Sequence, residues 1–346
     1  MRELRKIKEE ESRLYVSTGS TLLNLALSDN PYGGFALGKF ANIIGDYSAG
    51  KSFLAWTIFS EAVYNSKFDE YTLRYIEPEV AFEFNVIKLF GKKVEDRVLS
   101  DVVDRTVAKK KKDEPYTVED WYNDEEVILK QKIPFIDILD SLDATTTVAE
   151  YAREIDEGSY RVEKARLMPE ILRKIAGKVK DTNSLIIVVS QAKEPIGMTF
   201  GASTKTRAGG KALHFFCTYE IWMAIKSHIK RKDRDVGVNV RVKISKNKMT
   251  GKQREIEFPI YFDYGVDDET SMINFLLEEG VWNKPKNARS INTNGDFIDG
   301  TMETIIKHIE ENNGKDKLIQ IVAKKWREIE DSIATNRKGK YDGEAT

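Results

Sequence analysis

One short run constrains the fold of this chain more than any other feature. Residues 45–52 read GDYSAGKS, which fits the phosphate-binding pattern G-x-x-x-x-G-K-[ST]. Residues 40–44 before it have the apolar character of a short buried strand, and residues 53–64 after it repeat apolar side chains at helical spacing. A strand, a glycine-rich turn and a helix wrap backbone N–H groups around a polyphosphate. The sequence therefore predicts a site for a nucleoside triphosphate, with Lys51 on the outer phosphates and Ser52 on Mg²⁺.

Composition narrows the class of protein. A chain of 346 residues, 41% of them hydrophobic, can bury a large core, and its net charge of -1 means that any nucleic-acid site must be a local patch. The single cysteine, Cys217, excludes an internal disulfide and a zinc–thiolate cluster, and its apolar neighbours favour a buried structural thiol. No apolar run approaches the ~20 residues of a membrane span, and the charged N-terminus lacks a secretory signal, so we expect a cytoplasmic protein.

The middle of the chain alternates short apolar runs with helical patterns, which predicts an α/β core with a mostly parallel central sheet. The expected strands cover residues 40–44, 73–76, 135–139, 185–189 and 221–225. Residues 238–244 and 256–262 alternate strictly between apolar and polar, with a turn at 249–251 between them. These two segments predict an antiparallel hairpin that extends the sheet.

The flanking segments suggest further domains. Residues 1–16 carry a thin apolar stripe, which fits either a short helix docked on a neighbouring molecule or a solvated tail. The lysine-rich segment 109–115 fits a solvated loop or a loop that contacts DNA. Helical patterns at 269–279, 301–312 and 315–333 predict a small C-terminal α+β domain. We therefore expect an N-terminal segment 1–28, a core 29–264, a second domain 265–335 and a disordered tail 336–346.

Acidic and amide side chains follow several of the expected strands. Asp140 directly follows the strand 135–139 and would fall beside the phosphate loop, where it could hold Mg²⁺ through water. Asp137 is its rival, but it lies mid-strand, where an ionised group is costly. Glu77 and Glu79 follow another strand, and either could orient water unless this is merely a charged loop. Gln191 at the end of the strand 185–189 could sense a phosphate.

Two further features suggest anion binding. Residues 192–211 form a long segment that is rich in Gly, Ser and Thr, with basic residues and Phe200, which suits single-stranded nucleic acid. Lys246 and Lys248 lie two residues apart, so strict alternation would put them on the face of Val242 and Ile244. They form either a cationic pincer for an anion or a solvated strand end.

Together, in this order, these positions resemble the RecA family of DNA recombinases over nearly the whole chain. The closest segments are 17–27 (STGSTLLNLAL), 34–39 (GFALGK), 139–142 (LDSL), 166–177 (RLMPEILRKIAG), 183–191 (NSLIIVVSQ), parts of 196–215 and 242–248 (VKISKNK), with the C-terminal part around Trp282 and Trp326. The resemblance implies a RecA-like P-loop NTPase core.

The resemblance also implies roles for individual residues. Glu79 would activate water with Glu77 as a neighbour, and Gln191 would couple the γ-phosphate to a second DNA-binding loop, the first being residues 145–161. Lys246 and Lys248 would act on ATP held by an adjacent subunit, and the chain start would pack on a neighbouring core to build a helical filament. ATP would contact the loop and its surroundings, namely Gly45, Asp46, Tyr47, Ser48, Ala49, Gly50, Lys51, Ser52, Phe53 and Asp140, with Mg²⁺ at Ser52 and Asp140.

The implied DNA contacts gather in and beside the two loops. They are Arg153, Arg161, Arg166, Arg173, Lys193, Phe200, Lys205, Arg207, Gly209, Gly210 and Lys211. Departures from the family pattern at Phe53, at the Glu77–Pro78–Glu79 run and at Val86, where an adenine-stacking Tyr is expected, point to a divergent, bacteriophage-type member.

The expected function is that of a DNA-dependent ATPase acting as a recombinase in recombination and repair. It would form helical filaments on single-stranded DNA and promote homologous pairing and strand exchange with duplex DNA. Two alternatives remain open: a ring-forming helicase of the same fold, and a nucleotide-gated DNA-binding mediator. A metal enzyme of another kind is disfavoured because His214, His228 and His308 are scattered.

Overall fold

A computed structural model describes residues 13–79, 81, 84–100, 114–153, 162–193, 206–207 and 210–335. The chain divides into two compact units, the first ending at Asp268 and the second beginning at Glu269. Most of the expected N-terminal helix and of the lysine-rich segment, and all of the C-terminal tail, lie outside the described residues.

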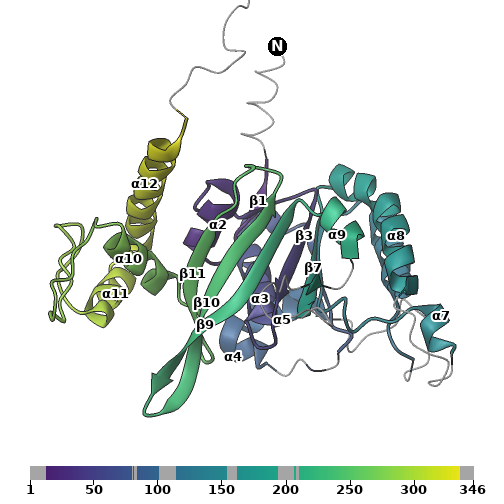
Figure 1. Cartoon of the computed structure of the whole chain (residues 1–346), viewed down its shortest axis with the longest axis horizontal. Coiled ribbons are helices and arrows are strands. Elements are labelled where there is room, and N and C mark those ends of the chain that lie inside the picture. Colours follow the sequence, from purple (N-terminus) through teal and green to yellow (C-terminus); the bar gives the residue numbers. More distant parts are fainter. Residues whose placement is uncertain are drawn as a thin grey trace, which may run out of the picture. The chain divides into compact units, whose positions relative to one another are not determined.

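The first unit is built on a ten-stranded sheet in the order β12-β11-β10-β9-β3-β7-β6-β4-β5, with β8 beside β7 (Figure 1). The strands are β3 (Lys39–Gly45), β4 (Thr72–Ile76), β5 (Val98–Ser100), β6 (Phe135–Leu139), β7 (Leu185–Lys193), β8 (Thr206–Arg207), β9 (Tyr219–Arg231), β10 (Arg234–Asn247), β11 (Glu255–Tyr261) and β12 (Gly265–Val266). The run from β9 to β5 through β3 is parallel, whereas β10, β11 and β12 pair antiparallel. The α/β architecture and the antiparallel extension are both confirmed.

Helices cover the parallel strands, which explains their unbroken apolar runs. The helices α6 (Val118–Gln131), α8 (Val162–Asp181) and α9 (Gly210–Phe216) bury one cluster against β3, β6 and β7. Trp121, Phe135, Leu172 and Val188 lie at its centre and are fully buried. The helix α3 (Lys51–Val63) packs with α4 (Val86–Phe90), α5 (Lys92–Arg97) and β12. A short helix, α2 (Thr21–Ser28), contacts β10 and β11, and β1 (Tyr15–Val16) pairs with β2 (Phe35–Ala36). The remaining short helices are η1 (Ser66–Phe68) and α7 (Val148–Tyr151).

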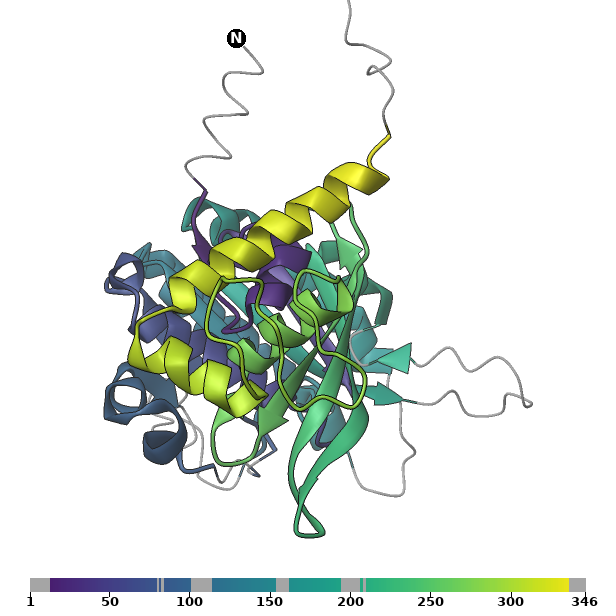
Figure 2. The ribbon, with the colours of Figure 1, turned by 90° about the vertical axis from the view of Figure 1, so that its left-hand side faces the viewer.

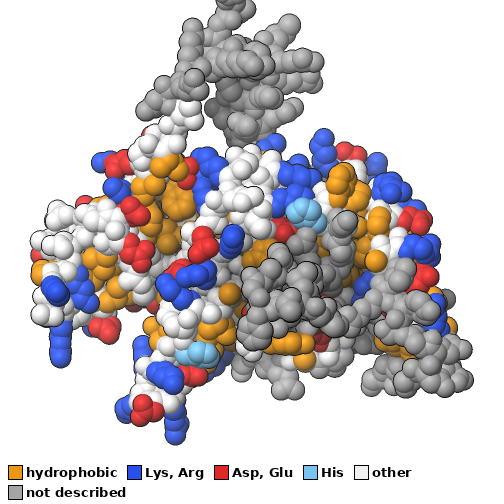
Figure 3. All heavy atoms as spheres, viewed as in Figure 1, with side chains coloured by type: hydrophobic (Ala, Val, Ile, Leu, Met, Phe, Trp, Pro, Cys, Tyr) orange, Lys and Arg blue, Asp and Glu red, His pale blue; other side chains and the backbone are white. Residues whose placement is uncertain are grey.

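A second antiparallel hairpin, formed by β9 and β10, was not predicted, and both strands are longer than the expected segments 221–225 and 238–244. Its far half projects beyond the neighbouring strands (Figures 1 and 2) and turns at Lys232 and Asp233, which have φ of 48° and 61°. Lys and Arg side chains gather on this projecting end (Figure 3). The exposed basic residues there are Lys226, Lys230, Arg231, Lys232 and Arg234. Short apolar stretches predicted only the buried half of each strand because the projecting half has no core to face.

The second unit contains α10 (Asp268–Glu278, whose first residue belongs to the first unit), α11 (Met302–Glu311) and α12 (Lys315–Ile333). Two isolated antiparallel bridges, Asn283 with Asn292 and Ile291 with Gly300, tie together the segment between α10 and α11. Trp282 is buried in this unit, and its indole N–H donates to Asp296 at 2.8 Å. Within the described part of the chain, no helix is both long and apolar enough to cross a membrane.

Candidate nucleotide site

The phosphate loop joins β3 to α3, and its two outer glycines are required, Gly45 by close packing and Gly50 by its backbone conformation. A Cβ on Gly45 would lie 2.5 Å from the carbonyl oxygen of Met223 on β9. Gly50 has φ of 84°, and a Cβ there would lie 2.5 Å from the Ile260 side chain. Gly50 is also the N-cap of α3 and has no side chain to cap the helix. The first N–H groups of this helix can therefore donate hydrogen bonds to an anion.

Lys51 begins α3 and turns back over the loop. Its ammonium donates to the carbonyl oxygens of Gly45 at 3.1 Å and Asp46 at 2.7 Å. Burial lowers the pKa of Lys51, and the nearby carboxylates of Asp140 and Glu79 oppose that shift. The loop therefore presents a cation that is only partly hydrated at the positive end of a helix.

Asp140 follows β6 and lies beside the start of α3. Its carboxylate accepts a hydrogen bond from the Tyr75 hydroxyl at 2.8 Å. Burial raises the pKa of Asp140, and the hydroxyl groups of Ser52 and Tyr75 oppose that rise. The rival, Asp137, has a different partner: its Oδ1 lies 2.6 Å from Nε of the buried Arg74. This ion pair makes an ionised carboxylate tolerable mid-strand and leaves Asp140 as the acid at the phosphate loop.

Glu79 is distinguished from Glu77 by its contacts. Glu79 Oε1 accepts from the Ser141 hydroxyl at 2.6 Å and from the Gln191 side-chain amide at 3.0 Å. Glu77 instead is buried and accepts from the backbone N–H of Ala81 at 3.1 Å. The structure thus joins the ends of three strands, β4, β6 and β7, through one exposed carboxylate.

A cavity of about 360 Å³ opens between these groups and is lined by Ser52, Tyr75, Glu77, Glu79, Ala81, Phe84 and Asp140. The Ser52 hydroxyl and the Asp140 carboxylate are the hard oxygen ligands that Mg²⁺ prefers, and Mg²⁺ usually keeps several waters beside one or two carboxylates. The donor set and the glycine cradle therefore fit a magnesium–triphosphate group. Among the described residues no cluster of three or more His, Cys, Asp or Glu side chains could hold a metal ion.

Lys246 and Lys248 do not meet this chain's own phosphate loop. Lys246 pairs across the sheet with Glu220, which lies beside Asn42 in the middle of β3, whereas the phosphate loop begins at Gly45, the last residue of that strand. Both ammonium groups donate to carbonyl oxygens at the end of α9: Lys246 to His214, and Lys248 to Phe215 at 2.8 Å. Burial, and then the positive charge of Lys248, lowers the pKa of Lys246. A bound anion would reduce the repulsion between the two ammonium groups.

The face predicted for these lysines was wrong. The pairing of β10 with β9 shifts between Ile244 and Lys246, so Ser245 is an extra residue in a β-bulge. Ile244 still pairs with Ile221, but Lys246 now pairs with Glu220 and shares its face. Asn247 takes the buried face instead and donates to Leu27 at the end of α2. Strict alternation fails because one inserted residue reverses every side chain that follows it.

Comparison with known proteins decides the family. Residues 3–267 match the model of the RecA N-terminal domain. The chain belongs to the RecA N-terminal domain family. It is 29% identical over 297 residues to a protein named Protein RecA from Marinobacter nauticus (strain ATCC 700491 / DSM 11845 / VT8), covering 86% of this chain and 79% of that protein. It is 30% identical over 269 residues to Protein RecA from Pseudomonas putida, covering 78% of this chain and 70% of that protein.

The DNA-contact residues expected from the RecA family are placed only in part. On α8, the exposed side chains of Arg166 and Arg173 line a hollow of about 440 Å³ together with Pro169, Glu170 and Lys174. Arg153 lies just after α7, the short helix in the first expected loop. The backbones of Lys193, Arg207, Gly210 and Lys211 lie in β7, β8 and α9. The remaining expected contacts, Arg161, Phe200, Lys205 and Gly209, lie outside the described residues.

The second expected DNA loop of this RecA-family chain has a defined base. Ala192 pairs antiparallel with Arg207, and Lys193 pairs with Thr206. The loop therefore leaves β7 two residues after Gln191 and returns directly before α9, the helix whose end receives the lysine pair.

Sequence reasoning missed Phe84, which is half-exposed beside the cavity. Its ring packs 5.0 Å from that of Phe53, which in turn lies 5.7 Å from Phe90. Phe53, noted as a departure from the family, is thus buried under an aromatic cluster. Only the density of aromatic residues around residue 84 could have signalled this, because the packing partners lie in two separate helices.

Proposed function

We propose that this chain is an ATP-dependent recombinase that forms helical filaments on single-stranded DNA and promotes homologous pairing and strand exchange in recombination and repair. The observation that carries the proposal is the separation of the two cationic groups. Lys51 bonds Gly45 at the last residue of β3. Lys246 pairs with Glu220 beside Asn42 in the middle of β3, and the backbone of Lys248 bonds Thr218 beside Phe40 near its start. Both lysines bond the end of α9.

A separated pair suits a shared site between copies. Two different surfaces that meet head to tail make a heterologous contact, which builds an open helix when its rotation does not close. ATP bound at Lys51 and Ser52 of one copy would be completed by Lys246 and Lys248 of the next. Bound ATP with Mg²⁺ supplies the phosphoryl group whose transfer to water releases ADP and phosphate.

The chain's own residues have distinct tasks in this proposal. Glu79 holds and deprotonates the attacking water, and its bonds with Ser141 and Gln191 set its position. Asp140 and Ser52 orient the metal, and the first N–H groups of α3 hold the phosphates. Gln191 links the site to the second loop, so nucleotide state can order that loop on DNA. Arg166 and Arg173 on α8 contact the DNA backbone.

Imaging and hydrolysis together test the proposal. Purified protein is incubated with single-stranded DNA and either ATP or a non-hydrolysable analogue, then viewed by electron microscopy, while ATP turnover is measured with and without the DNA. We expect helical filaments with either nucleotide, and we expect single-stranded DNA to stimulate the hydrolysis of ATP. Closed rings that unwind duplexes without exchanging strands would favour a helicase, and DNA binding whose biological effect survives Glu79→Gln would favour a mediator.

A further inference from the structure

Glu220 is a buried carboxylate for which the proposed reaction has no direct use. It stands at the start of β9 and is 2% exposed. Three side chains contact it: His214 Nδ1 of α9 lies 2.7 Å from Oε2, and Oε1 accepts from Ser245 of β10 at 2.8 Å and from the Trp222 indole of β9 at 3.3 Å. Burying a carboxylate is costly unless it is well bonded, so this arrangement calls for an explanation.

The contact with Ser245 fixes the bulge that directs the lysine pair. Ser245 is the extra residue of β10, and its hydroxyl also lies 3.3 Å from the backbone oxygen of Glu220. The bulge puts Lys246 on the α9 side and Asn247 on the α2 side, where Asn247 bonds Leu27 at 2.8 Å. Bulges characteristically re-aim side chains in this way.

The contact with His214 fixes the other partner of the lysines. The His214 ring bonds Glu220, and the His214 carbonyl oxygen receives the ammonium of Lys246. Lys248 reaches the next carbonyl, that of Phe215, and its ammonium lies 5.5 Å from the centre of the Phe215 ring. The last carbonyls of a helix lack partners within it, so they suit cations. One carboxylate therefore holds both the strand that carries the lysines and the helix end that receives them.

We propose that Glu220 is a positioning residue for ATP hydrolysis: through Ser245 and His214 it aims Lys246 and Lys248 at the nucleotide of an adjacent subunit. This inference rests on the proposed function. It assigns Glu220 no contact with the nucleotide, and it predicts that loss of Glu220 affects turnover in the assembly without weakening nucleotide binding to the chain's own phosphate loop.

The hold on α9 can be tested without nucleotide or DNA. Cys217 directly follows α9, is fully buried, and is the only cysteine of the chain. Its labelling by a thiol reagent is measured in the wild type, Glu220→Ala, Ser245→Ala, Glu220→Gln and a control, Glu125→Gln, which removes an equally buried carboxylate on α6. We expect labelling at least about tenfold faster in Glu220→Ala, since loss of a bond of ~1.4 kcal/mol raises local opening by that factor. Ser245→Ala should fall between. Glu220→Gln should stay near the wild type, because the amide keeps the shape: its oxygen can accept from Ser245 and Trp222, and its NH2 can donate to Nδ1 of His214 once the ring proton moves to Nε2.

Steady-state kinetics with single-stranded DNA tests the positioning role. For Glu220→Ala we expect kcat to fall about tenfold to a hundredfold, as for a small misplacement of reacting groups, with unchanged binding of a fluorescent ATP analogue in the absence of DNA. Glu220→Gln should restore most of the loss. Unchanged Cys217 labelling, or faster labelling with an unchanged kcat, overturns the proposal. If the wild type hydrolyses no ATP, the proposed function fails and the positioning role with it, while labelling still reports whether Glu220 holds α9.

Discussion

At the scale of single residues, one arginine in the core is surrounded by more acid than it can neutralise. Arg74 of β4 lies 2.6 Å from Asp137 and forms a second, close ion pair with Glu125 of α6. Both carboxylates are fully buried, and a third, Asp124, lies 4.0 Å away. Burial, followed by the charge of Asp137, raises the pKa of Glu125 well above its usual range, and Arg74 only partly opposes this.

The raised pKa of Glu125 predicts a pH dependence of stability that Glu125→Gln removes. The folded protein binds a proton that the unfolded chain, with a Glu pKa of about 4.3, has lost. The free energy of unfolding of the wild type should therefore fall as pH rises from about 4.3 through the raised value, and level off above it. Urea unfolding followed by circular dichroism at a series of pH values measures this slope. Identical slopes in the two proteins would show that Glu125 does not carry it.

Glu79 supports a separate prediction at this scale. Glu79→Gln should lower kcat by about 10²- to 10⁴-fold, the usual contribution of a general base, while filaments still form because binding groups are untouched. Turnover with DNA and electron microscopy of the same samples provide the measurement. Glu77→Gln is the matched control: its carboxylate is turned to the Ala81 N–H, so its effect on kcat should be much smaller. Equal losses in both variants would contradict the assignment of Glu79 as the base.

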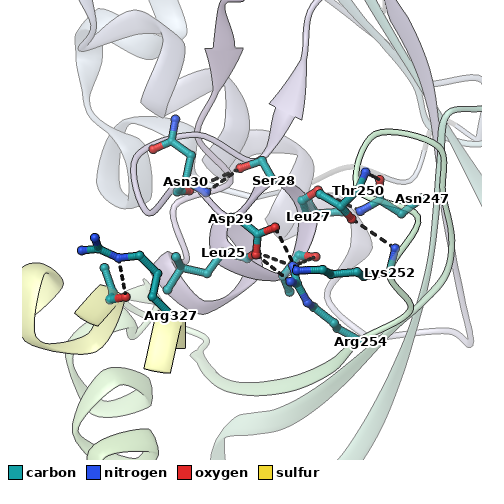
Figure 4. A network of polar contacts seen from close by, with 12 residues as sticks. Leu25, Leu27, Ser28, Asp29, Asn30, Asn247, Thr250, Lys252, Arg254 and Arg327 are labelled. Atoms are coloured by element: carbon teal, nitrogen blue, oxygen red, sulfur yellow. Dashed lines mark hydrogen bonds and ion pairs between the residues drawn. The ribbon is translucent and has the colours of Figure 1, made fainter. Parts of the chain in front are cut away.

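At the scale of elements, the loop between β10 and β11 closes the end of α2 (Figure 4). Arg254 donates to the carbonyl oxygens of Leu25 at 3.0 Å and Ala26 at 3.1 Å, and it pairs with Asp29 at 2.6 Å. The last carbonyl groups of a helix have no hydrogen-bond donor within it, and here Arg254 of the loop is that donor. Since Asn247 bonds the same helix end, α2 also fixes the end of β10, where Lys246 and Lys248 flank Asn247.

Arg254→Ala should therefore destabilise the first unit by about 1.5–3 kcal/mol, the range for hydrogen bonds to a charged group that is largely buried. The midpoint of urea unfolding is the measurement. Lys252→Ala is the control, since Lys252 also pairs with Asp29, at 3.5 Å, but is 44% exposed. Such exposed pairs contribute little, so Lys252→Ala should change stability by less than about 1 kcal/mol. A larger loss for Lys252→Ala than for Arg254→Ala would refute this account.

The elements also show what can be predicted from sequence. Residues 135–139 and 315–333 have the bounds expected of them, because an apolar run and a helical period are local signals. The phosphate loop and Asp140 fall at the ends of strands for the same reason, whereas β7 continues two residues past Gln191. The bulge at Ser245 could not be predicted, because it depends on the register with another strand. The bond between Glu79 and Gln191 joins residues far apart in sequence, so only the assembled sheet reveals it.

At the scale of the whole molecule, one copy keeps Lys51 apart from Lys246 and Lys248, so the ATP site that we propose needs two copies. A mixing experiment follows. Lys51→Ala and Lys246→Ala should each abolish DNA-stimulated hydrolysis alone, whereas an equal mixture should regain activity at about a quarter of its junctions, where an intact loop meets an intact lysine pair across a heterologous contact. Turnover against mixing ratio is the measurement. The variant that carries both substitutions is the inactive control. A mixture without activity would indicate that Lys51 and Lys246 act in the site of the same subunit.

The short antiparallel base formed by β7 and β8 has a consequence for how signals would travel. The chain leaves β7 two residues after Gln191, and it returns through β8 shortly before α9, whose end accepts hydrogen bonds from the lysine pair. In the proposed assembly Gln191 would lie beside one nucleotide and the lysine pair beside another. Nucleotide binding at one site would thus affect the next site always in the same direction along the assembly. The two ends of such a polymer would not be equivalent: a subunit added at one end would be affected by the site of its neighbour, and a subunit added at the other end would affect it.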